Sequence, residues 1–238
     1  MKHPRKAMMI HTLKEVCTFP RLLLICVLCL SLLLYGSACQ SAEEEAASMP
    51  VSMIEVQEGI DSMATEDFTE CSETTEFVKL SVKDYGDIIL RLQSSVAPLT
   101  TAHFQALVAD GYYNGLTFHR VYKDYLIQAG KGADVSTVKG EFTENGVANR
   151  ISHVRGVLSM ARNRNYDSAT SEFFICHGDA TFLDGSYAAF GYVIAGLGTV
   201  DKIAAAPVDV QPDMAGEISL PQEPIVIQKA CFVKPKAS

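Results

Sequence analysis

The 238-residue sequence contains no tryptophan, and after residue 39 it has no CxxC pair and no histidine pair at zinc spacing. It also lacks the GxGxxG and Walker-type loops that hold nucleotide phosphates, and the GxSxG turn that carries a hydrolase serine. These absences argue against a zinc domain, a nucleotide-binding fold and a serine hydrolase of that type. We therefore expect no metal ion and no cofactor.

Positive charge is scarce outside the N-terminus. After residue 39 the chain carries 15 Lys and Arg against 27 Asp and Glu, which gives that part a net charge near -12. A protein that binds nucleic acid needs clustered Lys and Arg to displace the counterions of the phosphates. The charge balance argues against a nucleic-acid partner.

The first 39 residues have a different composition. A stretch with five bases and one acid contains an uncharged run, Leu22 to Tyr35, which Gly36-Ser-Ala-Cys39 follows. A basic region, a short apolar region and small residues before a cleavage point are the layout of a secretory signal. Residues 1–38 are therefore interpreted as a signal peptide. Cys39 resembles the lipidated first residue of a mature bacterial lipoprotein, although Gly36 stands where such signals usually have leucine.

Two alternatives to lipidation remain open. Cleavage after Ala38 without lipidation would release a secreted protein. An uncleaved apolar segment over residues 22–39 would just reach the length that spans a bilayer. All three interpretations place the remaining chain outside the cytoplasmic membrane, and a membrane-anchored lipoprotein is the first of them.

Residues 39–75 have the composition of an acidic, flexible tether. Residues 40–76 carry eleven acids without a single Lys or Arg, and they show no strand-like alternation. Met53, Val56, Ile60 and Met63 follow a weak helical spacing, so a transient helix is the alternative. The folded domain is expected over residues 76–238.

Strand-like segments dominate this domain. One helix is expected to start near Pro98 and end before Gly111, and a second to span residues 200–206 with Thr199 as its N-cap. Strands and helices do not alternate as in an α/β protein, so we expect a mainly β fold. The pattern predicts a closed eight-stranded antiparallel β-barrel capped by two α-helices. The expected strands are residues 77–82, 87–92, 116–121, 125–129, 154–161, 173–177, 188–194 and 224–233.

The stretch from Thr117 to Gly130 is expected to form two strands that place a cation beside an apolar pocket. Side chains alternate across a strand, so Arg120 is expected on the face opposite His119. Leu126 and Gln128 share a face on the second strand. His119 is accordingly interpreted as a structural residue rather than a base.

Six segments resemble, in order, the signature blocks of the cyclophilins, which are peptidyl-prolyl cis-trans isomerases. They are Phe118-His-Arg120, Gln128-Ala-Gly130, Leu158-Ser-Met-Ala161, Ser171-Glu-Phe-Phe-Ile175, Phe182-Leu-Asp-Gly185 and Ala189-Phe-Gly-Tyr-Val193. The resemblance covers about residues 76–233, looks like the bacterial exported or lipoprotein branch, and implies the same barrel with two helices. It implies that Arg120 is the catalytic residue. It further implies a set of substrate-binding residues: Tyr125, Leu126, Gln128, Ala161, Arg162, Asn163, Glu172, Phe174, Phe182, Leu183 and Tyr187.

Glu172 departs from the family pattern, which usually has glutamine at this position. A carboxylate accepts hydrogen bonds but donates none unless it is protonated. We expect altered substrate anchoring, with a salt bridge to Arg120 or Arg162 as one route, rather than lost activity.

Two functions are compatible with these residues. The first is a monomeric prolyl isomerase at the membrane surface that acts on proline-containing segments of exported proteins and assists their folding. The second is a non-catalytic module that holds such segments as a chaperone or scaffold. The presence of Arg120 and of the apolar pocket residues favours the first, whereas Glu172 leaves the second open.

Overall fold

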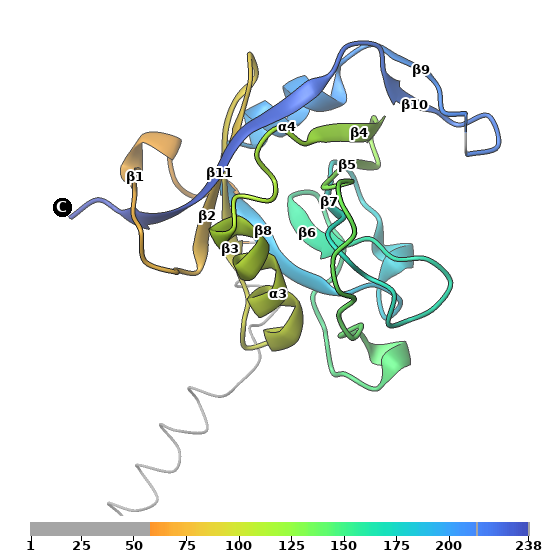
Figure 1. Ribbon diagram of the computed structural model, residues 1–238, viewed down its shortest axis with the longest axis horizontal. Coiled ribbons are helices and arrows are strands. Elements are labelled where there is room, and N and C mark those ends of the chain that lie inside the picture. The colour runs from red at the N-terminus through yellow and green to blue at the C-terminus, as the bar shows by residue number, and fades with distance from the viewer. Residues whose placement is uncertain (1–57, 213, 238) are drawn as a thin grey trace, which may run out of the picture. The chain divides into compact units, whose positions relative to one another are not determined.

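The computed structural model describes residues 58–212 and 214–237 (Figure 1). The predicted signal peptide and Cys39 lie outside these residues. Within the described ranges, no helix is long and apolar enough to cross a bilayer.

Eight strands of the described chain close into an antiparallel barrel in the order β11-β2-β3-β8-β6-β7-β5-β4, and β4 pairs back onto β11 (Figure 1). This arrangement confirms the predicted fold class. The strands are β2 Phe77–Val82, β3 Gly86–Leu92, β4 Thr117–Tyr122, β5 Leu126–Ala129, β6 Val157–Met160, β7 Phe173–Cys176, β8 Ala189–Ala195 and β11 Ile225–Pro235.

Strand β11 has three successive partners along its 11 residues. Ile225 and Val226 pair with β4, and residues 227–232 pair with β2. The last part pairs with β1, which is Phe68–Glu70. Because β11 joins β4 to β2, it closes the barrel and removes the free edge that each strand would otherwise expose.

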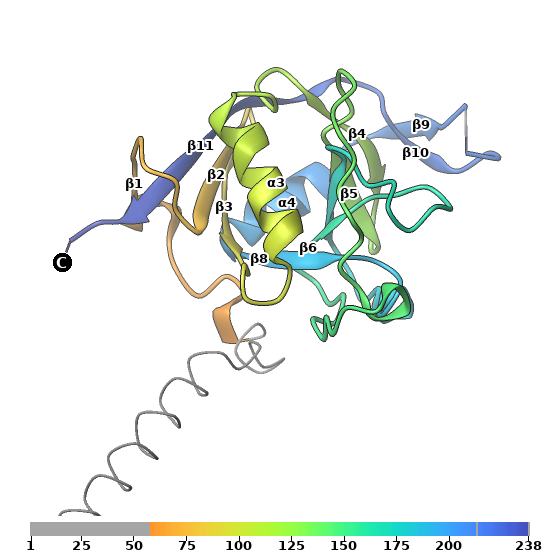
Figure 2. The same ribbon diagram turned by 60° about the horizontal axis from the view of Figure 1, so that its bottom comes forward.

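Two α-helices in the described chain cover the barrel, α3 (Pro98–Ala109) and α4 (Leu197–Ala204) (Figure 2). Helix α3 begins at Pro98 and ends before Gly111, as predicted. Its Phe104 lies in the barrel core, where its ring centroid is 5.4 Å from that of Phe173 on β7 and 5.2 Å from that of Phe190 on β8. Val200 of α4 belongs to the same core, so both helices are held by the packing of apolar side chains.

The start of α4 differs from the prediction. Its N-cap is Gly196 in the left-handed conformation, with φ of 94°, so Thr199 is not the N-cap. The backbone N–H of Leu197 donates to Oδ1 of Asp61 at 3.0 Å. The helix can therefore start earlier because a carboxylate 136 residues away satisfies its first turn.

The segment before the barrel binds to it, which corrects part of the predicted tether. After the 3-10 helix η1 (Thr65–Asp67), β1 pairs with β11. The backbone N–H groups of Asp61 and Met63 donate to carbonyl groups of β8 at 3.0 Å, and Thr75 Oγ1 donates to the carbonyl of Val233 at 2.8 Å. The prediction of a solvated tether is therefore wrong for residues 58–75. Its upstream part, residues 39–57, lies outside the described residues.

Glu70 of this segment is bound by two bases of the barrel, one of them 159 residues later in the chain. Glu70 lies 2.8 Å from the Nζ atom of Lys79 and 2.5 Å from that of Lys229. The Lys229 and Lys79 ammonium groups hold the pKa of Glu70 at about 2. Phe68 is buried, with its ring 5.6 Å from that of Phe77. Composition alone does not show such partners, because they become available only when β1 pairs with β11.

A hairpin follows α4 that the sequence pattern did not predict. It consists of β9 (Val208–Val210) and β10 (Ile218–Pro221) and forms its own two-stranded sheet beside β4 (Figures 1 and 2). The side-chain Nε2 of Gln211 in its loop donates to the backbone carbonyl of His119 at 3.0 Å. We call residues 208–221 the β9–β10 hairpin. It reaches the site described next. The short 3-10 helices η2 (Thr143–Asn145) and η3 (Thr181–Leu183) lie in the loops between barrel strands.

Candidate active site

A β-bulge in β4 sets the direction of Arg120. Phe118 pairs with Ala129 and Arg120 pairs with Gln128, so two residues of β4 advance for one residue of β5. Phe118 and Val121 lie in the barrel core, whereas His119 and Arg120 both contact polar side chains. The expectation that His119 and Arg120 point to opposite faces is therefore wrong, because the bulge interrupts the alternation.

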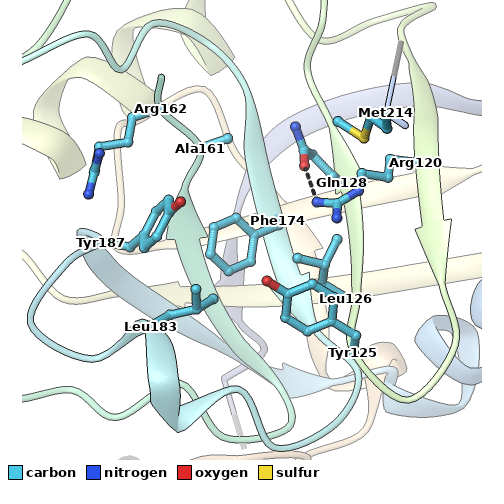
Figure 3. A pocket seen from close by; sticks show the side chains of 10 residues that line it. All are labelled: Arg120, Tyr125, Leu126, Gln128, Ala161, Arg162, Phe174, Leu183, Tyr187 and Met214. Carbon is cyan, nitrogen blue, oxygen red and sulfur yellow. Dashed lines mark hydrogen bonds between the residues drawn. The ribbon is translucent and has the colours of Figure 1, made fainter. Parts of the chain in front are cut away.

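Arg120 lies at a cavity of about 250 Å³ (Figure 3). Every residue that lines it, apart from Met214, is among the predicted site residues. The lining residues are Arg120, Tyr125, Leu126, Gln128, Ala161, Arg162, Phe174, Leu183, Tyr187 and Met214.

The apolar wall of the cavity is separate from the barrel core. Leu126 of β5, Phe174 of β7 and Leu183 of η3 form their own cluster, against which Tyr125 and Tyr187 pack. Phe174 is 2% exposed, and its ring meets that of Tyr187 edge-on at 6.0 Å. On β5 the alternation holds, because Leu126 and Gln128 face the cavity while Ile127 lies in the core. The cavity thus has an apolar wall with the Arg120 guanidinium at its edge.

The guanidinium of Arg120 forms a two-point ion pair with Glu217 of the β9–β10 hairpin. Nε donates to Oε1 at 2.7 Å, and Nη2 donates to Oε2 at 2.8 Å. The hydrogen bonds to Glu217 raise the pKa of Arg120 above its ordinary value. The Tyr125 ring centroid lies 5.7 Å from Cζ of Arg120, which adds a cation–π contact. Arg120 therefore stays charged at the edge of the apolar wall.

A series of hydrogen bonds continues from Arg120 through Gln128 to Glu172. Arg120 Nη1 donates to Gln128 Oε1 at 3.3 Å, and Gln128 Nε2 donates to Glu172 Oε2 at 2.8 Å. The same carboxylate oxygen lies 3.2 Å from Nε2 of His119. Hydrogen bonding by His119 and then by Gln128 lowers the pKa of Glu172. These hydrogen bonds hold the side-chain amide of Gln128 with its oxygen towards Arg120.

The expected salt bridge of Glu172 to Arg120 or Arg162 is therefore wrong. Gln128 lies between the carboxylate and Arg120, accepts from the guanidinium and donates to the carboxylate. Glu172 is paired with His119 instead. The bulge at His119, which no local pattern indicated, makes this pairing available.

Behind Phe174 lies a Ser-His-Asp arrangement that the sequence did not reveal. His153 Nδ1 is 2.8 Å from Asp184 Oδ1, and His153 Nε2 is 3.0 Å from Ser159 Oγ. These roles are those of a hydrolase triad, but Ser159 is 0% exposed and a substrate cannot reach it. Burial also lowers the pKa of His153, so the ring is neutral near pH 7. Because its ring stacks on Phe174 at 6.0 Å, the arrangement supports the cavity wall rather than a hydrolytic reaction.

Arg162 is fixed at the opposite side of the cavity. Its Cζ lies 5.1, 4.9 and 4.6 Å from the ring centroids of Phe142, Tyr166 and Tyr187, and its Nε donates to the carbonyl of Ser186 at 2.8 Å. Three aromatic rings thus hold this second guanidinium in place.

Three predicted site residues do not line the cavity. Glu172 is hydrogen-bonded to Gln128, as described. Phe182 is 71% exposed, with its ring 5.5 Å from that of Tyr125. Asn163 organises its own loop, since its Oδ1 accepts from the backbone N–H of Asn165 at 2.8 Å. The structure gives the positions of all predicted site residues, and their roles stay predictions.

Two residues near Arg120 were missed, Met214 and Glu217, and both belong to the β9–β10 hairpin. The signal that could have revealed the hairpin is weak. Val208-Asp-Val and Ile218-Ser-Leu alternate, and Pro212 and Gly216 lie between them. Among the described residues, no group of three or more His, Cys, Asp or Glu side chains is placed to hold a metal ion.

The family model described as cyclophilin type peptidyl-prolyl cis-trans isomerase/CLD matches residues 77–230. The match begins at the first residue of β2 and ends inside β11. It therefore includes seven complete barrel strands, the first part of β11, and Arg120 with the predicted substrate-binding residues.

Individual proteins show the same relationship. The chain is 37% identical over 171 residues to the peptidyl-prolyl cis-trans isomerase A of Dickeya dadantii, which covers 68% of this chain and 87% of that protein. It is 38% identical over 154 residues to a peptidyl-prolyl cis-trans isomerase of Acinetobacter baylyi, which covers 60% and 78%.

A solved structure agrees in fold. A Cryptosporidium parvum cyclophilin type peptidyl-prolyl cis-trans isomerase, crystallised in the presence of the dipeptide ala-pro, superposes with a TM-score of 0.56 and 28% identity. The superposition covers 66% of this chain and 98% of that one.

Proposed function

Because the chain belongs to the cyclophilin type peptidyl-prolyl cis-trans isomerases, we propose that Arg120 is its catalytic residue. We also propose that the protein acts on exported proteins that fold at a membrane surface. The observation that carries the proposal is the charged guanidinium of Arg120 at the edge of a cavity that has a buried apolar wall. No nucleophile or cofactor has a part in the proposed reaction.

The reaction requires only that a twisted amide be stabilised. Rotation about a peptide bond meets a barrier of about 18–20 kcal/mol because resonance is lost at the twisted geometry. At prolyl bonds the two planar forms are close in energy, yet they exchange over tens to hundreds of seconds. A catalyst must therefore bind the twisted amide better than either planar form.

Arg120 offers what the twisted amide gains. As resonance breaks, the proline nitrogen recovers a lone pair and accepts a hydrogen bond. A guanidinium has five N–H donors, and Glu217 and Gln128 engage Nε, Nη1 and Nη2 once each. One donor on each terminal nitrogen remains, which suits one hydrogen bond to the proline nitrogen and one to the proline carbonyl.

The rest of the cavity would bind the two sides of the prolyl bond. Leu126, Phe174 and Leu183 line a slot that suits a pyrrolidine ring and excludes water, which strengthens the contact with the guanidinium. Gln128 and the backbone at residues 161–163 would hold the residue before proline. The dipeptide present in the Cryptosporidium parvum crystal is a ligand of this chemical kind.

The sequence before the barrel supports the proposed location. Residues 1–38 have the layout of a secretory signal, and Cys39 follows small residues as in a lipoprotein. We propose that the chain is anchored by lipid at Cys39, or otherwise secreted, and acts there as a monomer on proline-containing segments.

Two measurements test this proposal. Intact mass of the membrane-extracted protein is expected to match a chain that starts at Cys39 and carries lipid, and an unlipidated chain starting at Cys39 or later would exclude the anchor. Refolding of an exported protein with a slow prolyl step is expected to accelerate with the wild type but not with Arg120→Ala. Equal acceleration by both would exclude Arg120 as the catalytic residue.

A further inference from the structure

The β9–β10 hairpin contributes a residue to the site that the family resemblance did not supply. Glu217 holds Arg120 at 2.7 and 2.8 Å, and Met214 of the same loop lines the cavity. We propose that Glu217 is a positioning residue, which fixes the guanidinium of Arg120 in the orientation that the prolyl amide requires. This inference rests on the proposed role of Arg120.

The ion pair is shielded and well oriented. The side chains of Arg120 and Glu217 are 15% and 20% exposed, so the contact is less screened than a surface pair, whose contribution is small. Two parallel N–H···O bonds fix the plane of the guanidinium as well as its position. A single hydrogen bond, such as that from Nη1 to Gln128, would leave the plane free to rotate.

The edge of the guanidinium that Glu217 occupies is the one that substrate does not need. Nε and one N–H of Nη2 point to the carboxylate, whereas the two remaining donors lie on the terminal nitrogens. Glu217 therefore removes the rotational freedom of Arg120 without occupying those donors. Orientation of this kind lowers the activation barrier, because a misplacement of about 1 Å can cost about 100-fold in rate.

The hairpin is itself tied to the strand that carries Arg120. Gln211 in its loop binds the His119 carbonyl on β4 at 3.0 Å. Across the loop, the N–H of Gln211 donates to the carbonyl of Glu217 at 2.6 Å, and the N–H of Glu217 donates to that of Met214 at 2.9 Å. Glu217 thus approaches Arg120 from a backbone that is anchored next to it. Hydrogen bonding to Arg120 lowers the pKa of Glu217, so the carboxylate is charged above pH 4.5.

An opposite role is physically conceivable and gives the opposite result. If Glu217 competed with substrate for the guanidinium, its removal would free Arg120 and raise activity. Steady-state kinetics separate the two roles, because positioning is expressed in kcat and competition in KM.

The test compares the full-length wild type with Glu217→Ala, Glu217→Gln and the control Glu223→Gln in an isomerase assay on Xaa-Pro peptides. Glu223 is an exposed acid of the next loop, and its removal changes the net charge as Glu217→Gln does. We expect Glu217→Ala to lower kcat about 10- to 100-fold with KM within about threefold. Glu217→Gln, which keeps one acceptor, is expected to restore part of the loss. Glu223→Gln is expected to match the wild type.

A double-mutant cycle with Arg120→Ala decides whether Glu217 acts through Arg120. We expect Glu217→Gln to have no further effect when Arg120 is absent. An equal loss in both backgrounds, or an unchanged or raised kcat in Glu217→Ala and Glu217→Gln, would overturn the inference. If Arg120→Ala alone retains wild-type activity, the proposed catalytic role fails instead. Circular dichroism checks that each variant is folded.

Discussion

The two walls of the cavity are built differently. The barrel wall comes from β5 and β7, in which every residue is buried, and a further layer of His153, Ser159 and Asp184 supports it. The hairpin wall comes from the loop between β9 and β10, whose strand residues are mostly exposed or half-buried, and polar contacts hold it to β4. Arg120 lies between the walls and is bound by both.

We expect the two walls to have different roles because they are packed differently. A buried wall holds its shape because a shift would open voids in a close-packed interior. A hairpin with few buried apolar contacts belongs to the less stable part of a fold and can change with small effects on overall stability. We therefore expect the barrel wall to determine the stability and the fit of the proline ring. The hairpin is expected to determine how Arg120 is presented.

The largest effect is expected in the barrel wall. Phe174→Ala removes a ring that is 2% exposed and leaves a cavity against His153. The free energy of unfolding, measured by denaturant titration, is expected to fall by about 3–5 kcal/mol. Phe182→Ala is the matched control, because that ring is 71% exposed and its loss is expected to change stability by less than about 0.5 kcal/mol. Similar losses in both variants would contradict the separation of a buried wall from an exposed rim.

The next largest effect, a loss of catalytic efficiency, is expected at Arg120, where the two walls meet. Arg120→Ala is expected to lower kcat/KM about 100- to 1,000-fold, the usual range for removal of a donor to a developing lone pair or charge. Arg120→Lys keeps the charge but not the two-point geometry, so its kcat/KM is expected to lie between those of Arg120→Ala and the wild type. A protease-coupled assay on Xaa-Pro peptides measures both. Equal activity of Arg120→Lys and the wild type would show that charge alone is sufficient.

A smaller effect on activity is expected for Glu172→Gln, next to Gln128. The variant keeps an acceptor for Gln128 but loses the charge that faces His119, so kcat/KM is expected to change about two- to tenfold. The pKa of Glu172 is lowered from 4.5, so its stabilising effect is present above pH 4.5 and is lost as the pH falls through the lowered pKa.

Glutamine cannot lose a charge in this way. The free energy of unfolding of Glu172→Gln is therefore expected to fall less steeply below pH 4.5 than that of the wild type. If the variant has the same catalytic efficiency as the wild type and loses stability equally steeply below pH 4.5, the Glu172 carboxylate contributes nothing beyond what glutamine supplies.

The smallest effect is expected at Met214 on the hairpin wall. This side chain lines the cavity but is 39% exposed. Met214→Ala is expected to change the free energy of unfolding by less than about 0.5 kcal/mol and to raise KM about two- to threefold through lost apolar contact. A loss of stability comparable to that of Phe174→Ala would show that the two walls are equally important to the fold.

The same contrast explains what the sequence could predict. Leu126, Gln128 and Phe174 lie in strands whose alternation and block order are local, so their shared cavity followed from the sequence. Glu217 reaches Arg120 across 97 residues, and Asp61 reaches the start of α4 across 136. Such contacts depend on the closed barrel and leave no local pattern. The bulge at His119 is similar, because one extra residue reverses the expected face without changing the composition of β4.

The three successive partners of β11 bear on how the chain folds during synthesis. β11 follows all other barrel strands in the sequence, yet it supplies the pairing that joins β4 to β2 and holds β1. A nascent chain cannot complete the barrel until β11 has left the ribosome, because the edges of β2 and β4 have no other strand to close them in the described fold. The order of strands thus delays closure of the barrel until after β11 is made, and the edges of β2 and β4 stay unpaired until then.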